Sequence, residues 1–130
     1  MINELAKQVH QNAKDHGFFD EERNIGEMLC LIHSEVSEAL EADRKGKYCE
    51  INSIMLSGLA DKNYGASFCN DEAAKDHFEV YVKNTFQDEL ADIVIRVMDL
   101  AAFKNIDLEA HIKAKMRYNS LREYKHGKKY

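Results

Sequence analysis

The chain has 130 residues, of which 45% are hydrophobic and 32% charged, and its formal net charge is −5. This length and composition predict one folded domain with a hydrophobic core and exclude a wholly disordered chain. No stretch approaches the roughly 20 apolar residues that a membrane-spanning helix needs, and the polar N-terminus is unlike a signal peptide. We therefore expect a cytoplasmic protein without a membrane partner. The absence of proline favours long uninterrupted helices.

The net charge is an average over two unlike regions. Residues 113–130 hold seven of the 18 Lys and Arg residues but one of the 23 Asp and Glu residues, so this basic tail carries +6 and the preceding body −11. An acidic body argues against a large nucleic acid as partner. The tail is compatible with a local polyanion such as a phosphate group, and also with a solvated terminal helix.

Three cysteines, Cys30, Cys49 and Cys69, are widely spaced and form no CxxC pair. They predict neither a zinc site nor a disulfide framework, and free thiols fit a reducing cytoplasm.

Apolar residues at helical spacing predict four helices, over residues 3–16, 25–45, 78–104 and 107–121. Asn24 and Asp107 are suitable N-caps, and Gly46 is a suitable C-terminal stop. Residues 47–76 predict an irregular connection with one short helix, over 50–59. The pattern favours a single all-α domain over 1–130 with a four-helix-bundle-like architecture.

Two pairs of acidic residues border the apolar faces of the two longest predicted helices. They are Glu35 with Glu38 and Glu89 with Asp92, each spaced i, i+3. With about 100° of turn per residue, Glu35 and Glu89 fall at the edge of each apolar stripe, and the second acid lies about 60° away.

Packing these two helices together would bring four carboxylates together, which requires a cation or raised pKa values. Oxygen ligands with no nearby His or Cys suit Mg²⁺ or Mn²⁺. Each pair alone is also typical of a solvated helix face. Asp99 lies on the same border as Asp92, and we expect it to be solvated or paired with Arg96.

Two other chemistries fit poorly. A di-iron carboxylate bundle needs two Glu-x-x-His motifs, and here only Glu123 to His126 fits, in the basic tail. The chain has no GxxxxGK[ST] loop, which excludes a P-loop enzyme.

Three segments resemble, in the same order, the MazG-like all-α nucleoside triphosphate pyrophosphohydrolases. That family carries E-E-x-x-E on one helix and E-x-x-D on a later helix. Here the first motif reads Ser34-Glu35-Val36-Ser37-Glu38, with Ser34 in place of the usual first Glu, and the second reads Glu89-Leu90-Ala91-Asp92. The third segment is the C-terminal KMRYNSLREYKHGKK.

The resemblance implies Mg²⁺-dependent hydrolysis of a nucleoside or deoxynucleoside triphosphate to the monophosphate and pyrophosphate. Four acids would hold the metal, and they are Glu35, Glu38, Glu89 and Asp92. We assign Glu38 as the general base. Lys115 and Asn119 would contact the substrate by family analogy.

Three further basic residues, Arg122, Lys125 and Lys128, would neutralise the leaving pyrophosphate. The broad apolar stripe over 78–104 predicts a partner helix, and the resemblance also implies a homodimer or homotetramer.

Two alternatives stay open. One is a non-catalytic helical module that binds a nucleotide or a partner protein through the same basic tail. The other is a hydrolase of a signalling nucleotide. A panel of candidate substrates separates these readings.

Overall fold

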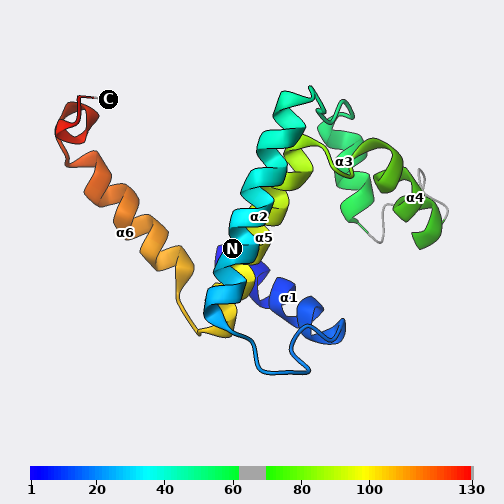
Figure 1. Cartoon of the computed structure of the whole chain (residues 1–130), viewed down its shortest axis with the longest axis horizontal. Coiled ribbons are helices and arrows are strands. Elements are labelled where there is room, and N and C mark those ends of the chain that lie inside the picture. The colour runs from blue at the N-terminus through cyan, green and yellow to red at the C-terminus, as the bar shows by residue number, and fades with distance from the viewer. Residues whose placement is uncertain (62–69, 130) are drawn as a thin grey trace. The chain divides into compact units, whose positions relative to one another are not determined.

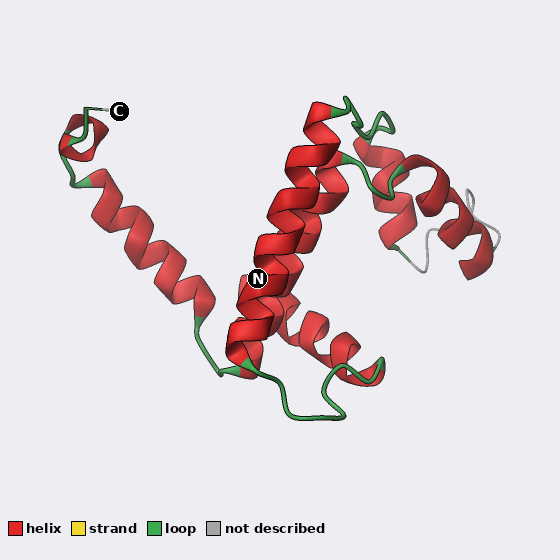
Figure 2. Cartoon of the chain, in the orientation of Figure 1, coloured by secondary structure: helices red, strands yellow, loops and turns green. Residues whose placement is uncertain are grey.

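The computed structural model describes residues 1–61 and 70–129, so Cys69 lies outside the described residues. Within these ranges the chain is all-α, with six α-helices, a terminal 3-10 turn (Tyr124–Gly127) and no strand (Figure 2). None of the helices in the described part is both long and apolar enough to cross a membrane. The chain divides into two compact units, Met1–Met28 with Ile95–Tyr130, and Leu29–Val94.

The first unit contains α1 (Ile2–Asp15) and α6 (Leu108–Ser120), which contact each other. The Asn3 side chain links them, because its amide nitrogen donates to Asp107 Oδ1 at 2.7 Å and its oxygen accepts from the Glu109 N–H at 3.1 Å. The apolar residues buried in this unit are Ala6, Met28, Met98 and Ala101.

The second unit contains α3 (Ser53–Ala60) and α4 (Asp71–Tyr81), together with most of α2 (Ile25–Arg44) and the first half of α5 (Phe86–Phe103) (Figure 1). Helices α3 and α4 contact each other. The small buried residues Ala39, Ala42 and Gly58 and the larger Val82 form its interior.

Three predicted helix ends are confirmed by their capping contacts. Asn24 Oδ1 accepts from the Glu27 N–H at 3.1 Å at the start of α2, and Asp107 Oδ1 accepts from the Ala110 N–H at 2.9 Å at the start of α6. Gly46 follows α2 with φ of +64°, a conformation that glycine adopts without steric cost. Local sequence signals therefore determine these ends.

The predicted single helix over 78–104 is wrong in one respect, because the chain breaks within it. Helix α4 ends at Tyr81 and α5 begins at Phe86. Asn84 between them has φ of +60°, in the left-handed region that asparagine tolerates better than most residues. Thr85 Oγ1 then donates to the Val82 carbonyl at 2.7 Å and accepts from the Asp88 N–H at 3.4 Å, which stabilises the start of α5.

The predicted irregular connection also contains more helix than expected. The short helix predicted over 50–59 is α3, capped by Asn52 Oδ1, which accepts from the Met55 N–H at 3.0 Å. Residues 71–76 were expected to be irregular but form the first turns of α4, where Asn70 Oδ1 accepts from the Ala73 N–H at 2.8 Å.

Large apolar side chains remain accessible on the long helices of the second unit. On α2 these are Leu29, Val36 and Leu40, which are 47–49% exposed, and on α5 they include Leu90 and Val94, at 44% and 50%. The spacings of seven and four residues place each set on one helix face. Apolar side chains of α5, within the stripe that the sequence analysis assigned to a partner, are therefore accessible in the single chain, and so are those of α2.

Candidate metal centre

Three glutamates from two helices meet in the second unit. Glu35 and Glu38 lie on α2 and Glu89 lies on α5, and one carboxylate oxygen from each lies within 4.8 Å of the others. Glu35 and Glu38 are one helical turn apart, so both reach the same side of α2. The sequence predicted this meeting of the two acidic motifs, and the structure brings three of the four predicted ligands together.

Hydrogen bonds hold the first turn of α5, which carries Glu89, against the segment that follows α2. The Phe86 N–H donates to the Lys47 carbonyl at 2.8 Å, and the Gln87 side chain pairs with the backbone of Cys49. The segment that follows α2 therefore holds the first turn of α5, and Glu89 lies in that first turn.

The three carboxylates differ in their access to water. Glu35 is 6% exposed and Glu89 is 5% exposed, whereas Glu38 is exposed. Charged side chains are rarely buried to this extent unless they are paired or hold a metal. The cluster thus has two buried oxygen donors and one donor that reaches solvent.

Burial raises the pKa of the Glu89 carboxyl, and the neighbouring carboxylates Glu38, Asp88, Asp92 and Glu35 raise it further. A bound divalent cation would reverse this effect, because it would place positive charge beside these carboxylates. Carboxylate oxygens without nitrogen or sulfur donors are the ligand set of Mg²⁺ and Mn²⁺. The residues present therefore fit such an ion.

Asp92, the fourth predicted ligand, lies one turn beyond Glu89 on α5 and is partly buried. It lies outside the group of three carboxylates, although its charge contributes to the raised pKa of Glu89. Ser34, at the position of the first motif residue, is exposed on α2.

The predicted substrate-binding residues belong to the first unit. Lys115 and Arg122 lie against the Tyr118 ring, with Nζ at 4.8 Å and the guanidinium carbon at 5.6 Å from its centroid. Lys125 and Lys128 are exposed. The tail therefore presents several accessible cations.

Asn119, four residues after Lys115 on α6, is partly buried. Its Oδ1 atom is buried and has no hydrogen-bond partner among the described residues. A buried acceptor without a donor is costly, so this atom is available to a ligand or to water.

One polar pair of the first unit was missed in the sequence. His10 Nδ1 lies 2.7 Å from Asp99 Oδ1, and the two side chains are 13% and 15% exposed. We expected Asp99 to be solvated or paired with Arg96, and its pairing with His10 at 15% exposure shows that it is not a solvated side chain. The rings of Phe19 and Phe103 lie next to the His10 ring, with centroid-to-centroid distances of 4.6 and 6.2 Å. The available signal was that His10 lies four residues after Ala6, on the buried face of α1.

Comparison with known proteins gave no match to a family model, to a curated protein or to a solved structure.

Proposed function

We propose that this protein is a Mg²⁺-dependent nucleoside triphosphate pyrophosphohydrolase, which converts a (deoxy)nucleoside triphosphate to its monophosphate and pyrophosphate. The observation that carries the proposal is the cluster of Glu35, Glu38 and Glu89, formed by two motifs that lie 54 positions apart at their first glutamates. The resemblance to the MazG-like family supplies the substrate class. The order of the motifs and the basic tail agree with that assignment.

Glu35, Glu38 and Glu89 would hold the ion, with Asp92 as the fourth ligand. When bound, the ion would offset the negative charge of the phosphoryl oxygens and lower the pKa of a water molecule. Mg²⁺ is the first choice, and Mn²⁺ has the same preference for oxygen ligands.

Glu38 is the best placed of the three to act as general base, because its carboxylate reaches solvent while the other two are buried. In the hydrolysis the water oxygen bonds to one of the two phosphorus atoms that flank the α–β bridging oxygen. The bond from that phosphorus to the bridging oxygen breaks, and the water proton passes to the Glu38 carboxylate. The products are the nucleoside monophosphate and pyrophosphate.

The basic tail would bind the polyphosphate. Lys115 and Asn119 would contact the substrate, and Arg122, Lys125 and Lys128 would neutralise the leaving pyrophosphate. The buried Oδ1 of Asn119, which has no hydrogen-bond partner among the described residues, supports its role as a ligand contact.

We also propose that a second copy of the chain completes a four-helix-bundle-like architecture, as a homodimer or homotetramer in the cytoplasm. The accessible apolar faces of α2 and α5 support this assembly. Burying one such leucine or valine contributes about 1–2 kcal/mol, so a few of them stabilise an interface substantially.

The test is a panel of nucleoside and deoxynucleoside triphosphates, together with signalling nucleotides, incubated with Mg²⁺ and assayed for pyrophosphate. Glu38→Gln and Asp92→Asn should abolish turnover and leave helix content unchanged. Glu41→Gln is the matched control, because Glu41 lies three residues after Glu38 but is exposed and paired with Arg44.

Turnover that survives Glu38→Gln and Asp92→Asn would refute the site assignment. Binding of Mn²⁺ or a nucleotide without turnover of any substrate would favour the non-catalytic module.

A further inference from the structure

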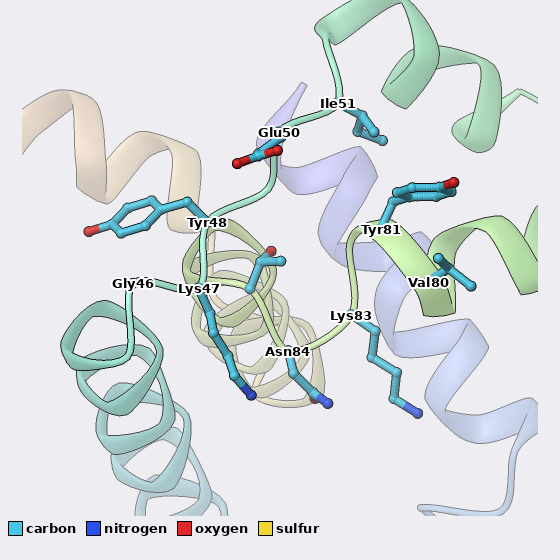
Figure 3. A pocket seen from close by; sticks show the side chains of 10 residues that line it. Gly46, Lys47, Tyr48, Glu50, Ile51, Val80, Tyr81, Lys83 and Asn84 are labelled. Carbon is cyan, nitrogen blue, oxygen red and sulfur yellow. The ribbon is translucent and has the colours of Figure 1, made fainter.

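A separate cavity of about 400 Å³ opens in the second unit, between the segment that follows α2 and the end of α4 (Figure 3). It is lined by residues of two short stretches, 46–51 and 80–85. This volume lies within the range of small-molecule sites. None of the four acids of the proposed metal centre lines it.

Contacts between the two stretches and the start of α5 fix the walls of the cavity. The Phe86 N–H donates to the Lys47 carbonyl at 2.8 Å, and the Gln87 side chain both accepts from the Cys49 N–H at 2.8 Å and donates to the Cys49 carbonyl at 3.2 Å. The Asn84 N–H donates to Asp88 Oδ2 at 2.9 Å. A ligand would therefore meet walls that are already held in place, which lowers the entropy cost of binding.

One side of the cavity carries positive charge. In Figure 3 the side chains of Lys47, Lys83 and Asn84 extend in the same direction from adjacent backbone. Glu50 is the one carboxylate among the described lining residues, and it points away from the lysine ends. Two ammonium groups and an amide donor suit an oxyanion that carries about two negative charges.

The other side is apolar and aromatic. Ile51, Val80 and Tyr81 line it (Figure 3). Val80 is 72% exposed and Tyr81 is 51% exposed, so this surface is in contact with water in the single chain. A planar organic group would cover it and stack on the tyrosine ring.

We propose that this cavity binds a phosphomonoester with a planar organic part, with the phosphoryl group at Lys47, Lys83 and Asn84 and the planar group against Tyr81 and Ile51. Binding here requires no divalent metal, since the lysines supply the positive charge. The proposal is thus independent of the proposed hydrolase activity, and it would stand if that activity failed.

The test uses calorimetry on the full chain in EDTA, with thymidine 5′-monophosphate, inorganic phosphate and thymidine as separate probes. Thymidine 5′-monophosphate should bind more tightly than either inorganic phosphate or thymidine. Lys47→Met and Lys83→Met should each weaken its binding about tenfold, which corresponds to the loss of one charge-assisted contact. Lys75→Met is the matched control, because Lys75 is an exposed lysine of α4 that does not line the cavity.

Tyr81→Ala should weaken the binding of thymidine 5′-monophosphate while leaving that of inorganic phosphate unchanged. Amide resonances of Lys47 and Asn84 should shift on addition of the nucleotide, which tests the site without any substitution. Glu89→Gln should bind the nucleotide as the wild type does.

Unchanged affinity in both lysine variants, or shifts confined to residues 108–129, would overturn the proposal. Equal affinity for inorganic phosphate and thymidine 5′-monophosphate would overturn the assignment of the aromatic wall.

Discussion

Replacing Glu89 by glutamine should stabilise the metal-free protein. Glu89 is 5% exposed, and one of its carboxylate oxygens lies within 4.8 Å of one oxygen each of Glu35 and Glu38. Two unit charges about 4 Å apart repel by about 1 kcal/mol in water and about 4 kcal/mol at an effective dielectric constant of 20. Because Glu38 is exposed, the lower part of this range applies. We expect the free energy of unfolding to rise by about 1–2 kcal/mol at pH 7.

The pH dependence of the free energy of unfolding tests the same prediction independently. Since the pKa of Glu89 is raised in the folded state, the folded protein binds more protons than the unfolded chain at pH values between the ordinary glutamate pKa of 4.5 and the raised pKa. The stability contribution of this residue therefore falls as the pH rises through that window and is constant above it. The difference in free energy of unfolding between Glu89→Gln and the wild type should therefore become smaller as the pH is lowered toward 4.5.

The assay is urea unfolding in EDTA, followed by circular dichroism, with Glu22→Gln as the control. Glu22 is exposed, and its substitution should change stability by less than about 0.5 kcal/mol. Added Mg²⁺ should stabilise the wild type more than the Glu89 variant, because the variant lacks a ligand charge. A variant less stable than the wild type in EDTA would show that Glu89 is held by favourable contacts, and would refute the repulsion argument.

Three other substitutions test the rest of the molecule. His10→Ala leaves the largely buried Asp99 without its 2.7 Å partner, so urea unfolding should show a loss of about 2–3 kcal/mol, whereas the exposed His16→Ala should cost less than about 1 kcal/mol. Thr85→Ala removes the side chain that accepts from the Asp88 N–H, and should lower the free energy of unfolding by about 1 kcal/mol. Hydrogen bonds from Lys113 and the N-terminal ammonium group lower the pKa of Glu109 to about 2, so its stabilising effect should be present above pH 4.5 and lost as the pH falls toward 2. Titration of the Glu109 carboxyl by NMR, with Glu109→Gln as reference, measures this, and a midpoint at the ordinary glutamate value would contradict it.

The sequence predicted those parts of the fold that depend on neighbouring residues. Helix caps and stops act within one helical turn, as Asn24, Asp107 and Gly46 do here. Such helix ends can therefore be predicted from the local sequence. The break at Asn84 was missed because apolar residues continue at helical spacing across it. The periodic apolar pattern indicates which residues are buried. A buried apolar residue in a turn, such as Val82, fits that pattern as well as a residue in a helix does.

The sequence predicted part of the candidate site, because that part depends on the spacing of residues within one helix. The spacing of Glu35 with Glu38, and of Glu89 with Asp92, places each pair on one helix face. No local rule states which acids become buried, since burial depends on what the opposite helix presents. The cavity lined by residues 46–51 and 80–85 was not predicted, because these two stretches are separated by 29 positions at their nearest ends and meet only in the folded chain.

The sequence by itself determined the all-α class, the helix ends at Asn24, Gly46 and Asp107, and the placing of each pair of acids on one helix face. Only the tertiary structure decided that Glu35 and Glu89 are buried beside one another while Glu38 reaches water, and that His10 pairs with Asp99. Helical periodicity assigns a residue to a face of its own helix. Distances between charges on different helices depend on packing, and those distances control pKa values and metal affinity.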